Sequence, residues 1–400
     1  MTDRVKRYRL GPAVALILLS LAVVAPVGAA AASGGRAGSR SATGSRSATG
    51  PATAAGTSEA TRLAQPAAWS SPTRVATGVY GFVSDIVDST GHTIIAATGH
   101  GGLWYITDRS GLWKKTRILT DLPNRSYREV SVALDPNDRV YIAVERSSCD
   151  DCAPGSSDGI FLVTDKGRTR GTFPSTPTKI APAGSGEPSL KVSHGHPFLA
   201  MVKPCCMPGP LPPVFLRTNA TGTWTQARVA DHGDAPALRI GSDGRPRIAF
   251  TKPSGIAYAV AGSVTGSFSV STVPGTAAFD NLVGLALDAH DRPQVVWVDD
   301  SGATRAVYDW RTASGWHAAE TIGALGDAFA VSFDVDSLGR PNFAAGGSKV
   351  RAFVRVSGSW VGTTITTSAD VTSLALRRAF NGHVVVAYAN FAGGVFVSTT

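Results

Sequence analysis

A repeated unit of 44 to 60 residues runs through this sequence from about residue 67 to its end. Its first mark is an aromatic residue that follows a small residue, usually glycine, and opens a strand; it occurs at Trp69, Trp113, Phe173, Trp224, Phe268, Trp316 and Trp360. Its second mark is a polar turn between two apolar segments, at His92, Arg139, His196, Arg245, Arg292, Arg340 and His383. The two marks alternate. A period of this length is typical of β-propellers and β-solenoids.

Each unit divides into four short apolar strands. In the clearest copy these are residues 283–288, 294–298, 304–310 and 316–322. Period-two alternation between turn residues predicts strands, and no segment of useful length has helical periodicity. Four antiparallel strands per unit make a propeller blade, so we predict an all-β, seven-bladed β-propeller.

The two ends of the repeat indicate a closed ring. The chain stops after a third strand, residues 394–398, whereas the repeat begins with a lone fourth strand, residues 69–77. We expect the first strand to complete the last blade, which removes two exposed sheet edges. Two stacked β-sandwich domains would explain neither the period nor this split unit.

The N-terminal region predicts export. Basic residues precede an apolar run from Leu10 to Val27, and small residues suited to signal peptidase follow, so residues 1–32 are interpreted as a cleaved secretory signal peptide. Residues 33–66 are rich in Ser, Gly, Ala, Thr and Arg, which favours a disordered linker. Residues 67–400 then form the propeller. We expect a secreted, extracellular protein without a membrane span after cleavage.

The charge distribution argues against a nucleic-acid partner. The chain carries +9 overall, but the first 66 residues contribute +6, which leaves +3 on the predicted propeller. No basic stripe interleaved with aromatic residues occurs there.

The unit LALDAHDRPQVVWVDDSGATRAVYDWRTASGWHAAETIG, residues 285–323, resembles secreted bacterial β-propellers with sialidase-like (BNR-type) repeats. The resemblance extends over about residues 67–400 and implies the fold. Active sialidases of that family carry Asp boxes of the form S-x-D-x-G-x-T-W, an arginine trio and a Tyr/Glu nucleophile pair. The nearest segments here, Thr107–Trp113 and Thr218–Trp224, are one residue short and do not have the aspartate in place, and no arginine trio can be assigned. The resemblance therefore does not extend to activity.

The four cysteines fall in the two longest insertions, in the loops between the second and third strands of neighbouring units: Cys149, Cys152, Cys205 and Cys206. In an exported chain this favours disulfides, with pairing across the two loops preferred. A thiolate site for copper or zinc, assisted by Met207, is the alternative.

We expect the ligand-binding face where these loops and the links between units lie together. Its candidate residues are His100, Tyr127, Arg128, Glu129, Glu145, Arg146, Asp150, Asp151 and Glu187. Glu145, Glu187 and Asp150 or Asp151 are predicted to converge there. The alternative interpretation is that these residues belong to an ordinary solvated loop surface and bind no ligand.

A ring of acids is predicted at the mouth of the pore, because links between units end in an acidic residue: Asp234, Asp280, Asp327 and Asp370, in addition to Glu129 and Glu187. Such a ring suits the binding of Ca²⁺ or a cationic ligand. The alternative is that each acid simply caps a turn in its link. We expect no cofactor other than this calcium candidate.

These observations favour a non-catalytic extracellular binding propeller, with a protein or carbohydrate as its partner. The alternatives are a glycoside hydrolase, sialidase-like or of another carbohydrate-active type, and metal capture through the cysteine loops. The sequence assigns no catalytic residue.

Overall fold

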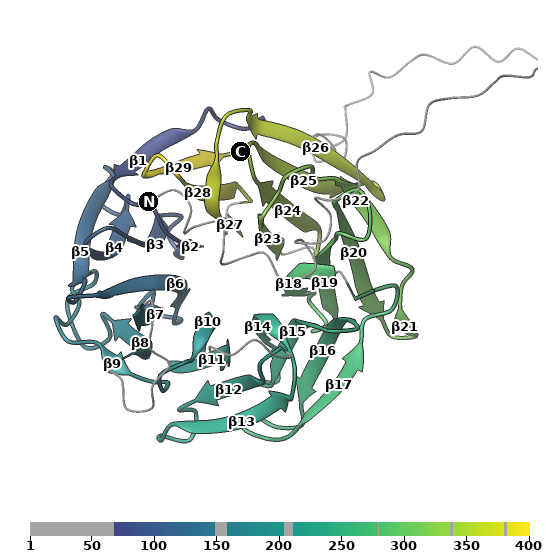
Figure 1. Ribbon diagram of the computed structural model, residues 1–400, viewed down its shortest axis with the longest axis horizontal. Coiled ribbons are helices and arrows are strands. Elements are labelled where there is room, and N and C mark those ends of the chain that lie inside the picture. The colour runs from purple at the N-terminus through teal and green to yellow at the C-terminus, as the bar shows by residue number, and fades with distance from the viewer. Residues whose placement is uncertain (1–67, 149–157, 204–210, 279, 337–338, 380–381) are drawn as a thin grey trace, which may run out of the picture. The chain divides into compact units, whose positions relative to one another are not determined.

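Seven antiparallel β-sheets form the blades of a β-propeller, arranged around a central axis (Figure 1). The computed structural model describes residues 68–148, 158–203, 211–278, 280–336, 339–379 and 382–400. No helix occurs within these ranges. The predicted fold class is confirmed.

Each blade has an inner strand A next to the axis, followed outward by strands B, C and D. Blade I consists of β2 (Val83–Val87), β3 (Thr93–Gly99), β4 (Gly102–Thr107) and β5 (Lys114–Thr120). Blade II consists of β6 (Arg125–Leu134), β7 (Val140–Ser148), β8 (Gly159–Thr164) and β9 (Thr178–Lys179). Blade III consists of β10 (Gly186–Ser193), β11 (His196–Val202), β12 (Val214–Thr218) and β13 (Thr225–Ala230).

The remaining blades follow the same order. Blade IV consists of β14 (Asp234–Ile240), β15 (Pro246–Lys252), β16 (Gly255–Ala261) and β17 (Phe268–Thr272). Blade V consists of β18 (Asp280–Leu287), β19 (Pro293–Asp299), β20 (Arg305–Thr312), β21 (Gly315–Trp316) and β22 (Glu320–Ala324). Blade VI consists of β23 (Ala330–Val335), β24 (Pro341–Gly346), β25 (Val350–Val356) and β26 (Ser359–Thr366). Blade VII consists of β27 (Val371–Arg378), β28 (Val384–Asn390), β29 (Gly394–Thr399) and β1 (Thr73–Thr77).

The hydrophobic core lies between neighbouring blades. One cluster joins Ile94 and Leu103 of blade I to Val132 and Ile142 of blade II, and all four side chains are fully buried. B strands are buried on both sides, as in β19, where every residue is buried, so their sequences are continuously apolar instead of alternating. D strands face solvent and are mostly polar.

The ring closes as predicted. Strand β1 pairs antiparallel with β29, with Thr73 opposite Val397 and Thr77 opposite Gly394. The pairing extends upstream, because the Ser70 amide donates to the Thr399 carbonyl (2.8 Å). The strand itself starts at Thr73 rather than at the predicted Trp69.

Serine hydroxyls on the inner strands link one blade to the next. Each accepts a hydrogen bond from a backbone amide of the following blade at 2.9–3.1 Å; the serine and amide pairs are Ser84 with Val132, Ser131 with Leu190, Ser189 with Leu238, Ser332 with Leu376, and Ser373 with Val83. The last pair joins blade VII to blade I. These bonds satisfy amides that the sheets leave unpaired.

Two D strands differ from the prediction. In blade II the strand does not open at Phe173 and consists of β9 alone, because Pro174 and Pro177 lack the amide hydrogens that a ladder needs. In blade V the predicted strand is split into β21 and β22, and the His317 ring between them stacks on Trp310.

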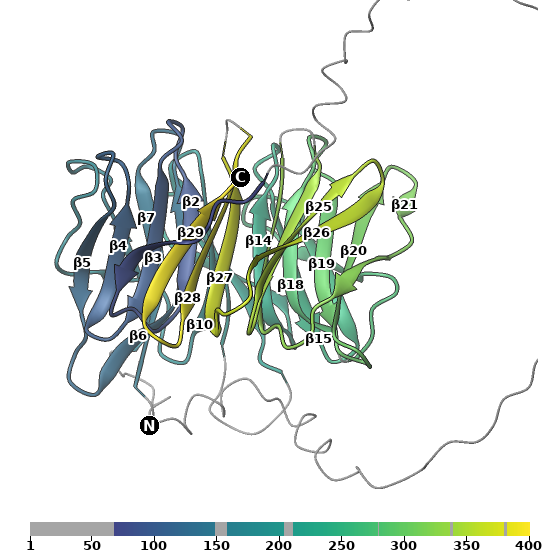
Figure 2. The ribbon, with the colours of Figure 1, turned by 90° about the horizontal axis from the view of Figure 1, so that it is seen from above.

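The strands run between two faces of the ring (Figure 2). We call the face that carries the B–C loops and the D–A links the link face, and the face that carries the A–B and C–D turns the turn face. No helix in the described ranges is long and apolar enough to cross a membrane.

Candidate functional site

Acidic residues of three successive blades lie at the link-face ends of their strands and act on one another through their charges. Glu129 lies on β6 and Glu145 on β7 of blade II, Glu187 lies on β10 of blade III, and Asp234 begins β14 of blade IV. The Glu145 carboxyl group lies beside the backbone of Gly186 and Glu187 in blade III. We call these four residues the carboxyl cluster.

Glu145 packs against the backbone of blade III. A Cβ atom at Gly186 would lie 3.0 Å from its Oε2 atom, so a glycine at this position lets the chain approach the carboxyl group. Burial, together with the negative charge of Glu129, raises the pKa of Glu145 to about 8, although Arg128 opposes the shift. Glu145 therefore keeps its proton at neutral pH.

Glu187 is held in a β-bulge of β10, where its backbone φ is +53°. This left-handed conformation is uncommon outside glycine and turns the side chain toward blade IV. Its Oε2 atom accepts a hydrogen bond of 2.6 Å from the Ala235 amide. Burial first, and then the negative charges of Glu129 and Asp234, raise the pKa of Glu187 well above its ordinary value.

The bulge recurs in the inner strands of neighbouring blades. Ala235 and Leu282 also have positive φ, and the registers of β14 and β18 shift beside them. The backbone geometry therefore belongs to the repeat. What is particular to blade III is the carboxyl group that the bulge presents.

The sequence suggested that Arg146 and Tyr127 lie in solvated loops, and the structure corrects this for both residues. Both are on paired strands, opposite one another in the ladder of β6 and β7, and both side chains are buried. The Arg146 guanidinium lies 4.0 Å from the centre of the Phe161 ring, a cation–π contact. Burial raises the pKa of Tyr127. Tyr127 and Phe161 belong to the hydrophobic core between blades I and II.

The other predicted residues are dispersed. His100 is exposed in the turn between β3 and β4, and Asp327 and Asp370 are exposed in the links before β23 and β27. Asp280 begins β18. Asp150, Asp151 and the four cysteines lie outside the described residues.

The expected calcium candidate finds no preformed site in the described part of the chain. There, no three His, Cys, Asp or Glu side chains are grouped so that they could hold a metal ion.

Sequence reasoning missed a set of charged side chains from inner strands near the axis. Arg377 lies 4.0 Å from Asp85, and Arg239 lies 3.8 Å from Asp334. Burial raises the pKa of Asp85 to about 7 against the effect of Arg377, and burial lowers the pKa of Lys191 well below its ordinary value. The sequence signal that could have revealed this set is the occurrence of charged residues within otherwise apolar inner strands.

The comparisons with known proteins identify the fold. No protein-family model and no curated protein sequence matches the chain. A polysaccharide lyase, an ulvan lyase of family PL25 solved with -[GlcA(1-4)Rha3S]- bound, is 10% identical, covers 81% of this chain and 94% of its own, and has a TM-score of 0.57. A protein of unknown function from Dyadobacter fermentans is 13% identical, covers 70% and 95%, and has a TM-score of 0.52. Virginiamycin B lyase from Staphylococcus aureus is 13% identical, covers 83% and 100%, and has a TM-score of 0.50.

These TM-scores establish a shared β-propeller architecture. At 10–13% identity the similarity carries no information about activity. Sialidases are also matched, such as one from Streptococcus pneumoniae with a TM-score of 0.45, and a likeness at that level carries no functional information.

Proposed function

We propose that this protein is an exported, non-catalytic binding propeller whose carboxyl cluster holds a cationic group of an extracellular protein, such as a lysine or arginine side chain. One observation carries the proposal: the Glu145 carboxyl group lies against the backbone of blade III beside Glu187, and burial and the negative charge of Glu129 raise the pKa values of both glutamates. A cation at this position would replace the protons and relieve the repulsion among the four carboxyl groups.

Glycoside hydrolysis needs a protonated acid and an ionised carboxylate on opposite sides of the scissile bond. The pKa is raised for both Glu145 and Glu187, so this pair alone does not supply both roles, and hydrolysis stays the alternative. Export rests on the N-terminal sequence, and metal capture by the cysteine loops stays a separate prediction.

The first test compares ligands that differ in their cationic group alone. Calorimetry of the mature protein should detect binding of a short lysine peptide and little binding of the same peptide acetylated on its lysines. A neutral N-acetylglucosamine tetramer should not bind. The double variant Glu145→Gln/Glu187→Gln should lose at least about tenfold in affinity, since charge-assisted contacts contribute about 1.5–3 kcal/mol each.

Asp370→Asn is the matched control. Asp370 is an exposed link-face acid with φ +43°, a conformation that asparagine tolerates. Its substitution should leave binding unchanged. Equal affinity for the acetylated peptide, or turnover of aryl glycosides that disappears in Glu145→Gln, would contradict the proposal.

A further inference from the structure

Four large apolar side chains are exposed along one part of the link face. Phe329, Tyr80 and Leu122 lie in the links that lead into β23, β2 and β6, and Phe391 lies in the B–C turn of blade VII. Between 39% and 52% of each residue is exposed. Within the described ranges, every exposed aromatic residue belongs to this set. We call these four residues the apolar arc.

Backbone hydrogen bonds connect Phe329 of blade VI to Phe391 of blade VII. The Phe329 amide donates to the Gly346 carbonyl (3.0 Å), at the start of the B–C turn of blade VI. That turn is bonded to the following link, residues 369–371, at 2.9 and 3.0 Å. In this link the Asp370 carbonyl accepts from the Phe391 amide (3.1 Å), so the two aromatic residues lie on one continuous surface.

Tyr80 continues this surface from blade VII to blade I. Its ring lies over Gly393, two residues from Phe391, so closely that a Cβ atom at Gly393 would clash with it. On the other side, the Tyr80 backbone lies against Gly99 at the end of β3. Tyr80 therefore spans the boundary between the two blades that ring closure brings together.

Leu122 lies where the apolar arc meets the carboxyl cluster. The neighbouring Asp121 accepts from the Gly101 amide in the B–C turn of blade I through Oδ2 (3.0 Å), and from the Tyr127 amide of β6 through Oδ1 (3.3 Å). Strand β6 also carries Glu129 of the carboxyl cluster. The apolar arc and the carboxyl cluster are thus neighbouring parts of the link face.

The grouping of these side chains is what gives them meaning. Single exposed apolar residues are common on protein surfaces. Here they follow one path over four successive blades, VI, VII, I and II, beside the carboxyl cluster. Apolar surface gathered in this way marks an interaction site, and aromatic residues are enriched in such sites.

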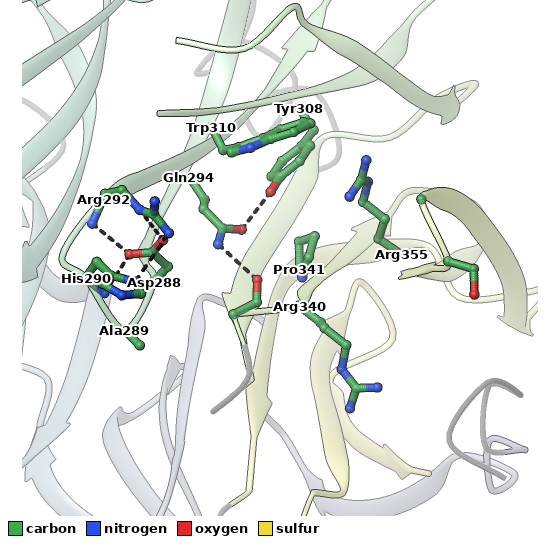
Figure 3. Close-up of a pocket in the computed structure, with 13 residues that line it drawn as sticks. Asp288, Ala289, His290, Arg292, Gln294, Tyr308, Trp310, Arg340, Pro341 and Arg355 are labelled. Atoms are coloured by element: carbon green, nitrogen blue, oxygen red, sulfur yellow. Dashed lines mark hydrogen bonds and ion pairs between the residues drawn. The ribbon is translucent and has the colours of Figure 1, made fainter. Parts of the chain in front are cut away.

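The turn face differs in that its charged side chains pair with one another. A cavity of about 420 Å³ opens there between blades V and VI (Figure 3). Each arginine that lines it is paired with a carboxylate: Arg292 with Asp288, Arg340 with Asp336, and Arg355 with Glu320. The carboxyl cluster and the apolar arc both lie on the opposite face.

We propose that the partner of the link face is a basic amphipathic peptide segment, which places a lysine or arginine at the carboxyl cluster and apolar side chains on the apolar arc. This inference rests on the proposed function and adds a second, apolar half to the binding surface. Charge complementarity assigns the basic end of the segment to the cluster, and the exposed rings lose contact with water when apolar side chains cover them. A neutral glycan would satisfy the rings alone.

The test compares two peptides by calorimetry with the mature protein. One begins with two lysines and continues with leucine and phenylalanine residues separated by serines; the other has serine in place of each apolar residue. The apolar peptide should bind the wild type at least about tenfold more tightly. In Tyr80→Ser/Phe391→Ser this difference should disappear, while the affinity for the serine peptide stays unchanged.

Leu112→Ser is the matched control, because Leu112 is 75% exposed but lies in the C–D turn of blade I, on the turn face. It should bind both peptides like the wild type. Tyr80→Phe keeps the ring over Gly393 and should retain the preference for the apolar peptide.

The outcomes separate this inference from the proposed function. Failure of both peptides to bind would contradict the proposed function and this inference with it. Equal affinity of the wild type for the two peptides, or an unchanged preference in Tyr80→Ser/Phe391→Ser, would overturn this inference alone. Binding of the N-acetylglucosamine tetramer that is lost in Tyr80→Ser/Phe391→Ser would overturn it in favour of a glycan.

Discussion

At the scale of single residues, the unusual feature is two glutamates whose pKa values are raised by their surroundings. Burial and the negative charge of Glu129 disfavour ionisation of Glu145 and Glu187. Both residues are nevertheless partly exposed to solvent. Such positions cost stability at neutral pH, and proteins commonly retain them at functional sites.

This cost predicts a pH dependence of stability. An unfolded Glu145 loses its proton near pH 4.5, whereas the folded residue keeps it up to about pH 8. The native state then binds more protons than the unfolded state between these values, so its stability should fall as pH rises from 4.5 to about 8. Thermal melts should show this decline.

Glu145→Gln mimics the protonated side chain and should flatten the decline. It should match the wild type near pH 4.5 and melt higher than the wild type at pH 8. Asp370→Asn should leave the wild-type slope intact. A Glu145→Gln variant with the same slope as the wild type would show that this carboxyl group is ionised in the native state.

At the scale of elements, one strand decides whether the ring is closed. Strand β1 supplies the fourth strand of blade VII, and without it β29 and the facing side of blade I would lose their outer cover. A sheet edge exposed in this way invites pairing with other chains.

Deletion of residues 67–78 should therefore lower the melting temperature markedly and cause aggregation, as followed by calorimetry and light scattering. Deletion of residues 33–56, within the predicted linker, serves as the control and should change neither. Unchanged melting after loss of β1 would mean that the ring does not depend on this closure.

At the scale of the whole molecule, the repeat predicts which elements become neighbours, because this depends on their order along the chain. The seven units, the split last blade and the approach of Glu145 to Glu187 follow because equivalent positions of successive blades become neighbours. The repeat does not predict the direction in which a side chain points. Arg146 packs inward on Phe161, and Pro174 and Pro177 shorten the outer strand of blade II.

The turn-face cavity also escaped prediction, for a related reason. The sequence marks Arg292 and Arg340 as structural turn residues, and their bonds to Asp288 and Asp336 agree with that. The cavity forms only where two blades bring these turns together. Convergence of this kind depends on the twist and spacing of blades, which no local pattern encodes.

If a cation binds at the carboxyl cluster as proposed, it displaces protons from these groups. Calorimetry of lysine-peptide binding at pH 7, in two buffers of different ionisation enthalpy, measures proton release directly. Because the lysine amine is already protonated at this pH, released protons must come from the protein. We predict release of about one proton or more from the wild type and almost none from Glu145→Gln/Glu187→Gln. Tight binding without proton release would contradict the account.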